Sequence, residues 1–208
     1  YLLQFYAKAG IPVLGVEPAA NVAQAAADRG VRTACEFFDA VVADRLAAEH
    51  GRADVVHANN VLAHVADLNG VVKGFRRIVK DDGVVVVEAP YVRDMIDNVE
   101  FDTIYHEHLC YFSLTALVTL FGRHGLTIHD VERLDIHGGS LRIFASSDAS
   151  APTRSPAVLA LLEEEERVAV SRPEFYRDFA DRVAGLKKDL VTLIATFRES
   201  GKRIAAYG

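Results

Sequence analysis

Short apolar runs alternate along this sequence with longer segments of helical composition, and this alternation constrains the fold more than any other feature. The runs have strand length and are rich in β-branched residues. They cover residues 11–18, 31–37, 53–59 and 84–90. Strands that alternate with helices form βαβ units, whose strands lie parallel in one sheet. We therefore predict an α/β fold with a doubly wound, Rossmann-like sheet.

Two further patterns refine the predicted sheet. The four valines at 84–87 show no alternation of polar and apolar residues, which indicates a central strand buried on both faces. Residues 126–135 and 137–147 have strand composition and are separated by a glycine-containing turn. We expect these two segments to form an antiparallel pair at one edge of the sheet.

The last quarter of the sequence changes character. Apolar side chains at spacings of three and four over 155–200 predict a pair of amphipathic helices. The glutamates at 163–166 are typical of a solvated helix face. We divide the chain into a sheet domain over 1–150, a helical connector over 151–201 and the first strand of a second α/β domain over 202–208. Both ends resemble interior segments, so we expect a fragment of a longer protein.

Composition excludes several classes of function. The sequence holds 23 lysines plus arginines against 29 acidic residues, and its formal net charge of −6 disfavours nucleic acid as a partner. No apolar run approaches the ~20 residues of a membrane span, and no signal sequence opens the chain, so we predict a cytoplasmic protein without membrane contact. Cys35 and Cys110 alone form neither a disulfide framework nor a four-cysteine zinc site. Oligomeric state is not predicted.

The first candidate ligand-binding residue is Glu17. Ligands of open α/β sheets bind beyond the carboxyl ends of the strands, and Glu17 follows the first predicted strand. A carboxylate there accepts hydrogen bonds from both hydroxyls of a ribose, in a nicotinamide dinucleotide as well as in other adenosine ligands. A helix-capping or exposed glutamate is the alternative. The glycine-rich loop that precedes such a residue by ~20 positions is not in this sequence.

Polar residues also follow the later strands. Asn59, Asn60 and His64 come after the strand at 53–59 and can hold carbonyl and hydroxyl groups by directional hydrogen bonds. Turn formation by the asparagines, and a partly buried histidine, are the alternatives. Tyr91 ends the next strand and is a candidate substrate contact.

A long aromatic connection over 91–113 carries Tyr105, His106, Glu107 and His108 in succession. Connections of this length are usually functional or disordered, and the aromatic content argues against disorder. An exposed polar loop is the alternative. Two imidazoles fall short of the three or four protein ligands of a zinc site, so we predict no metal here.

Residues 137–140, His-Gly-Gly-Ser, allow two interpretations. They suit a hairpin turn, or a place where backbone N–H groups approach a phosphate. In the second case His137 and Ser140 contact substrate, and Arg142 pairs with a pyrophosphate.

The order of these motifs resembles a known family. VLGVEP, DVVHANNVLAHV, VVVVEAPY, FDTIYHEHLCYFS and HGGSLRIF together are similar to the S-adenosylmethionine-dependent C-methyltransferases of nucleotide-linked deoxysugars, enzymes of antibiotic biosynthesis. The family implies an amino-terminal zinc-binding segment, a methyltransferase domain that opens with a strand and glycine-rich loop, and a carboxyl-terminal nucleotide-fold domain. By this resemblance the sequence lacks the zinc segment, the first strand and most of the last domain.

The resemblance also implies roles for matching residues. Glu17 binds the ribose of S-adenosylmethionine and Asn59 lies near that cofactor, while Asn60 and His64 face the sugar. The active-site cluster consists of Tyr105, Glu107 and His108.

The expected chemistry follows from the methyl donor. A carbon atom attacks a methyl sulfonium only after a proton leaves from beside a carbonyl, which here means C-3 of a 4-keto-deoxyhexose and an enolate intermediate. Imidazole, with a reference pKa of ~6.5, suits this proton transfer. We assign the base to His108, oriented by Glu107, and the stabilisation of the enolate oxygen to Tyr105 and His64.

Three other functions stay open from the sequence. They are an O- or N-methyltransferase of a small molecule, a nicotinamide-dependent sugar-modifying enzyme, and a non-catalytic nucleotide-fold scaffold.

Overall fold

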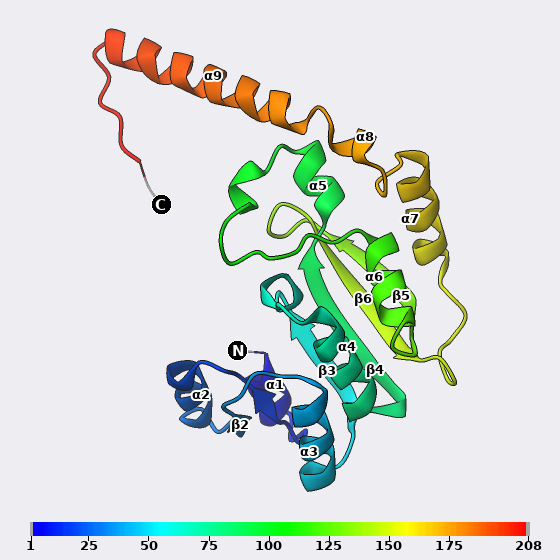
Figure 1. The fold of residues 1–208 in the computed structure, drawn as a ribbon. Helices are drawn as coiled ribbons and strands as arrows, with labels where there is room; N and C mark the ends of the chain where they lie inside the picture. Colours follow the sequence, from blue (N-terminus) through cyan, green and yellow to red (C-terminus); the bar gives the residue numbers. More distant parts are fainter. Residues whose placement is uncertain (1, 207–208) are drawn as a thin grey trace.

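A computed structural model describes residues 2–206 and contains two sheets (Figure 1). In the smaller one, β1 (Gly15–Val16) pairs in parallel with β2 (Thr33–Ala34). The larger sheet has the strand order β3 (Ala53–Asn59), β4 (Val79–Pro90), β6 (Ser140–Ser147), β5 (Leu126–Leu134). Within residues 2–206 no strand pairing joins the two sheets.

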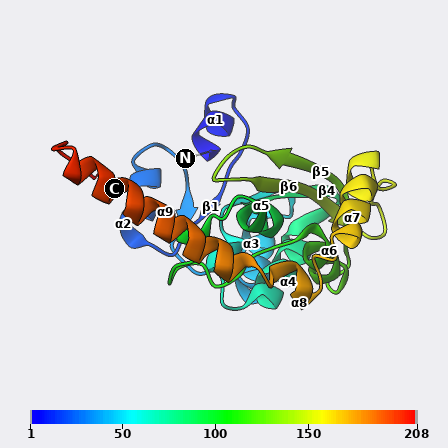
Figure 2. The ribbon, with the colours of Figure 1, turned by 90° about the horizontal axis from the view of Figure 1, so that it is seen from above.

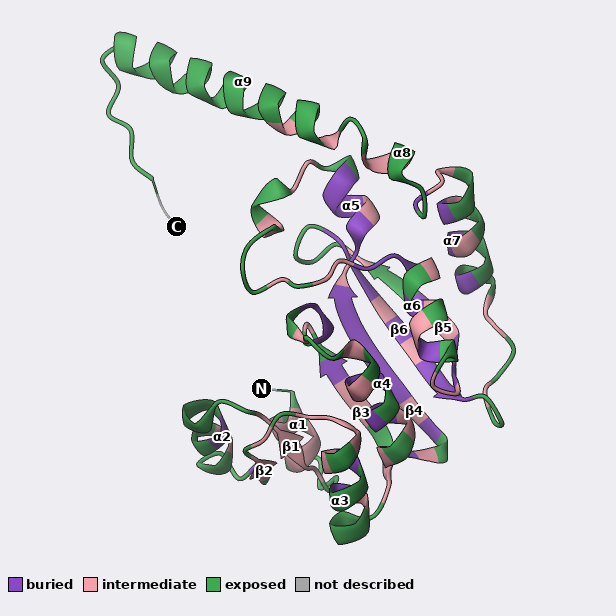
Figure 3. Ribbon diagram, viewed as in Figure 1, coloured by how far each residue is buried: buried purple, intermediate pink, exposed green. Residues whose placement is uncertain are grey.

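The pairing of the larger sheet matches the predicted α/β class. β3 and β4 are parallel, whereas β6 is antiparallel to both of its neighbours, β4 and β5. The antiparallel pair predicted at one edge is therefore confirmed. Val85, Val86 and Val87 are buried in β4, which lies between β3 and β6, so the predicted central strand is also confirmed (Figure 3).

Helices lie on both sides of the larger sheet. Figure 2 shows α4, α5 and α6 on one side of it and α1 on the other. The helices are α1 (Leu3–Lys8), α2 (Ala20–Ala27), α3 (Ala40–His50), α4 (Leu68–Ile78), α5 (Val92–Asp97), α6 (Leu114–Gly122), α7 (Pro156–Arg167), α8 (Pro173–Tyr176) and α9 (Phe179–Glu199), with 3-10 turns η1 (Leu62–His64) and η2 (Phe101–Thr103).

Two apolar cores result from this packing. The main core fills the space between β4, α4 and α6, with Phe75 and Phe121 among its buried members. A second, smaller core is formed by Val92, Met95, Ile96 and Val170, against which pack the partly buried residues Tyr111, Val168, Phe175, Tyr176 and Phe179. The second core thus joins α5 to the segment that leads into α9.

The turn between β5 and β6 adopts a conformation that needs glycine. His137, Gly138 and Gly139 have φ angles of 52°, 77° and 122°. A Cβ atom on Gly138 would collide with the carboxylate of Glu100, and one on Gly139 with that of Asp94. Tight packing of this turn against the chain after α5 therefore accounts for both glycines, as the hairpin interpretation requires.

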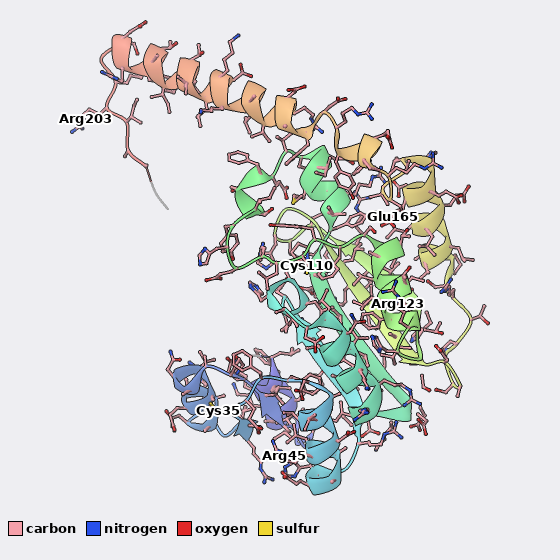
Figure 4. All side chains as sticks on the ribbon, viewed as in Figure 1. Cys35, Arg45, Cys110, Arg123, Glu165 and Arg203 are labelled. Atoms are coloured by element: carbon pink, nitrogen blue, oxygen red, sulfur yellow. The ribbon has the colours of Figure 1, made fainter. Side chains whose placement is uncertain are left out.

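Glu165 corrects the prediction of a solvated glutamate run. Its side chain is completely buried, and its carboxylate accepts hydrogen bonds from the backbone N–H groups of Leu114 at 2.7 Å and Thr115 at 2.8 Å (Figure 4). The first N–H groups of a helix have no partner within the helix and carry partial positive charge, so a carboxylate is favoured there. The first turn of α6 therefore recruits Glu165 into the interior.

The carboxyl-terminal region differs from the prediction in two ways. Three helices, α7, α8 and α9, replace the expected pair, and α9 extends away from the sheets with none of its residues buried (Figures 1 and 3). Residues 202–206 form no strand, since no strand lies beside them to pair with, and Tyr207 and Gly208 lie outside the described residues. The predicted domain boundaries stay predictions.

We expect Glu165→Ala to lower the free energy of unfolding by about 3 kcal/mol, because two buried N–H groups lose their acceptor. Glu163→Ala, in the same run but exposed, is the matched control and should change it by less than about 0.5 kcal/mol. Urea titration followed by circular dichroism measures both. Equal effects of the two substitutions would contradict the role given to Glu165.

Candidate functional site

Glu17 lies where the sequence predicted, directly after β1. Its backbone N–H donates to Ala34 O at 3.0 Å, which places the ends of β1 and β2 side by side. Its Oε1 accepts the N–H of Ala19 at 2.9 Å, so the helix-capping alternative is present in the structure, while Oε2 has no hydrogen-bond partner among residues 2–206. One carboxylate oxygen therefore remains available to a ligand.

Phe37 is a neighbour of this site to which the sequence analysis gave no role. It follows β2 and is 82% exposed, whereas the adjacent Phe38 stacks on Phe75 with ring centroids 5.5 Å apart. A large aromatic side chain exposed at a strand end offers a flat apolar surface to a ring-shaped ligand. The pair of phenylalanines after a predicted strand is the signal from which this residue could have been identified.

The two asparagines after β3 have different environments. Asn59 is exposed, whereas Asn60 has a φ of 54° and its backbone N–H donates to Glu88 O at 2.7 Å. The Asn60 side-chain amide also donates to Glu88 Oε1 at 3.4 Å. The turn geometry that formed the alternative for Asn60 is therefore present, and Asn59 keeps its amide free toward solvent.

Residues far apart in sequence meet in one aromatic cluster, as the sequence analysis expected. The backbone N–H of Leu109 donates to Ala63 O at 2.8 Å, which joins the 98–113 loop to η1. The ring centroid of His108 lies 5.0 Å from that of His64 and 4.6 Å from that of Tyr105. The loop thus brings two imidazoles and a phenol together at the surface.

The hydrogen bonding of His108 defines which of its nitrogens can act as a base. Nδ1 lies 2.8 Å from the carbonyl oxygen of Thr103. Because a carbonyl only accepts hydrogen bonds, Nδ1 carries the proton, and the neutral ring has its lone pair on Nε2. Nε2 has no hydrogen-bond partner in the described part of the chain, so it is free to take a proton.

Glu107 does not make the orienting contact with His108 that we expected. Its Oε2 accepts from Tyr105 Oη at 3.4 Å, and its Oε1 lies 3.9 Å from His106 Nε2. The backbone N–H of His108 donates to Tyr105 O at 3.1 Å, so this stretch is a turn rather than an extended strand. Thr103, not Glu107, provides the orienting group for the imidazole.

Tyr91 and Ser140, two predicted substrate contacts, lie in the interior. Tyr91 is 1% exposed, and burial together with the nearby Glu165 raises the pKa of its phenol. Ser140 is fully buried and donates from Oγ to Ile136 O at 3.1 Å. We leave both residues out of the proposed site, because neither side chain reaches a surface. His137 is exposed on the hairpin turn.

Arg142 is already paired in this structure. Its guanidinium donates to the buried carboxylate of Glu88 at 2.9 Å and to Glu132 at 2.9 Å. Nearby, burial and the charge of Arg142 lower the pKa of His57, whose Nε2 lies 2.8 Å from Tyr6 Oη. Arg142 therefore neutralises Glu88, and its predicted contact with a pyrophosphate stays a prediction.

Residues 2–206 contain no group of three or more histidine, cysteine or acidic side chains arranged to hold a metal ion. Across the same residues, no helix has both the length and the apolar composition required to cross a bilayer.

Solved structures share this fold. A protein from Pyrococcus horikoshii superposes with a TM-score of 0.55 over 70% of this chain and 76% of its own, at 16% identity. An S-adenosylmethionine-dependent methyltransferase from Anabaena variabilis superposes with a TM-score of 0.53 over 70% of this chain and 72% of its own, at 10% identity. These likenesses confirm the Rossmann-like fold.

The sequence comparisons assign the chain to a family. It is 40% identical over 206 residues to the C-methyltransferase NovU of Streptomyces niveus, across 99% of this chain but about half (49%) of the length of that protein. Residues 135–208 match the C-methyltransferase C-terminal domain, and residues 1–131 match the methyltransferase domain. The chain therefore belongs to the methyltransferase domain family.

Proposed function

We propose that this chain belongs to an S-adenosylmethionine-dependent C-methyltransferase that acts on the carbon beside the keto group, C-3, of a nucleotide-linked 4-keto-deoxyhexose. The observation that carries the proposal is the free Nε2 of His108 within the cluster of His64 and Tyr105. A single base surrounded by hydrogen-bond donors suits a reaction through an enolate. The similarity to a protein named as a C-methyltransferase supports carbon as the acceptor.

The residues at the ends of β1 and β2 fit the cofactor. Glu17 retains a free carboxylate oxygen for a ribose hydroxyl, and the exposed ring of Phe37 lies on the neighbouring strand end, where it suits an adenine. Asn59 adds an uncommitted amide after β3. When bound here, S-adenosylmethionine supplies the methyl group. Membership of the methyltransferase family favours this cofactor over a nicotinamide dinucleotide.

The proposed proton transfer uses His108 as the base. Nε2 takes the proton from the carbon beside the keto group, and the electron pair of that C–H bond moves to the keto oxygen to form the enolate. The imidazolium that results keeps its Nδ1–H bond to Thr103 O, so the ring stays oriented while its charge changes.

Tyr105 and His64 hold the enolate oxygen in this proposal. The Tyr105 hydroxyl has only a long bond of 3.4 Å to Glu107 in this structure, so turning toward a substrate costs it little. Removal of one such donor typically raises a barrier by ~3–4 kcal/mol. Asn60 and the exposed His64 face the sugar. The nucleotide-sugar substrate, the cytoplasmic location and the zinc-binding segment implied by the resemblance stay predictions.

We expect His108→Ala in the full-length enzyme to lower methyl transfer by at least about 100-fold, because the base is lost. Calorimetry should give S-adenosylhomocysteine an affinity within about twofold of wild type. His106→Ala, which removes the exposed neighbouring imidazole, is the control and should keep its turnover. Tyr105→Phe should lower the rate less than His108→Ala. Wild-type turnover in His108→Ala would exclude this residue as the base.

Glu17→Gln should weaken the binding of S-adenosylhomocysteine about tenfold, because an amide replaces the charged acceptor for the ribose hydroxyls. The KM for the sugar nucleotide should stay within about twofold of wild type. Titration calorimetry with S-adenosylhomocysteine and, separately, with NAD measures both the loss and the cofactor class. Binding of NAD in place of S-adenosylhomocysteine would refute the cofactor assignment.

A further inference from the structure

We propose that Tyr111 is a positioning residue for the base, holding His108 in the tautomer and orientation that proton transfer requires. The inference rests on the proposed function and adds to it a residue that touches neither the substrate nor the cofactor. Its starting point is the carbonyl group of Thr103, which two side chains share.

The shared carbonyl fixes the two side chains relative to each other. Tyr111 Oη donates to Thr103 O at 3.3 Å, and the same oxygen accepts from His108 Nδ1 at 2.8 Å. The two rings also meet edge to face, with centroids 6.2 Å apart and an interplanar angle of 84°. Tyr111 therefore restrains the imidazole in two ways, through the carbonyl that orients it and through direct ring contact.

Tyr111 itself is held by a rigid part of the molecule. Its ring packs against the second core, whose buried members come from α5 and from the segment that follows α7. Arg182, in the first turn of α9, donates to the carbonyl oxygens of Ile96 at 2.9 Å and Asp97 at 2.6 Å. The beginning of the α9 helix is thereby tied to α5, and the surface loop carrying His108 rests on a packed base rather than on solvent.

The electrostatics of Tyr111 suit this role. Burial raises the pKa of its phenol, and the neighbouring Tyr105 raises it further. The hydroxyl therefore stays protonated throughout the neutral range and always acts as a donor to Thr103. Without it, the carbonyl would be held by His108 and by its own backbone alone, and the imidazole would sample orientations in which Nδ1 is not bonded.

A matched control lies in the same core. Tyr176 also packs there, and its hydroxyl also donates to a main-chain carbonyl, Val170 O, at 2.9 Å. Among the described residues it makes no hydrogen bond or ring contact with His108. Phenylalanine in place of either tyrosine removes one phenolic hydrogen bond from the same packed region, so a purely structural contribution would affect both variants equally.

The experiment compares Tyr111→Phe and Tyr176→Phe in the full-length enzyme. The readouts are kcat, the KM for both substrates, the thermal midpoint, and solvent-deuterium exchange beside the keto group with S-adenosylhomocysteine bound. Tyr111→Phe should lower kcat and the exchange rate about tenfold and leave both KM values within about twofold. Tyr176→Phe should match it in thermal midpoint but exchange at the wild-type rate.

Equal exchange rates in the two variants would overturn the positioning role. A wild-type enzyme that neither exchanges deuterium nor methylates carbon would instead refute the proposed function. In that case nitrogen NMR of the His108 imidazole still tests Tyr111, because it reports the fraction of the ring protonated at Nδ1. That fraction should fall in Tyr111→Phe and not in Tyr176→Phe, and an unchanged fraction in both would overturn the inference.

Discussion

The buried carboxylate of Glu165 binds the first turn of α6, and the arrangement of the candidate site depends on this interaction. It joins α7 to residues that lie about fifty positions earlier, with hydrogen bonds of 2.7 Å and 2.8 Å to the N–H groups of Leu114 and Thr115. Burying a carboxylate is costly unless it is paired and hydrogen-bonded. The unpaired N–H groups at a helix N-terminus supply such partners, and Ser113 caps the same turn from its own side chain.

The fixed start of α6 closes the base of the loop that carries the aromatic cluster. Tyr91 and Phe112 form a bridge between the two ends of that loop, and the backbone N–H of Val92 donates to Phe112 O at 2.9 Å. Farther out, Leu109 binds Ala63 and brings His108 to His64. A long polar loop thus acquires a defined shape, because it is held at its base by buried contacts and at its middle by η1.

The strands and the composition of the site could be predicted from the sequence. β3 has the bounds expected from its apolar run, and the density of titratable and aromatic residues at 105–108 indicated the cluster. These signals are local: a strand repeats every two residues, and unusual chemistry concentrated in four residues is visible without a structure. The proximity of His64 and His108 followed from the resemblance to a family rather than from periodicity.

The environments of single polar side chains could not be predicted in the same way. Glu165 stands in a run of four glutamates, and only the position of α6 decides that this one is buried. Likewise the partner of His108 is a main-chain carbonyl, Thr103 O, which has no sequence signature. Tyr91 and Ser140 follow or begin strands as substrate contacts do, but the packing above them covers both. Each outcome depends on contacts between residues distant in sequence.

The central claim is that the cluster around His108 directs the methyl group to carbon. The most direct measurement is NMR of the product formed from S-adenosylmethionine labelled with carbon-13 in its methyl group and a nucleotide-linked 4-keto-deoxyhexose. We expect the labelled methyl to couple to the ring carbon beside the former keto position, as a C–CH3 group. A signal from an O–CH3 or N–CH3 group would contradict the account, because such a transfer needs no enolate.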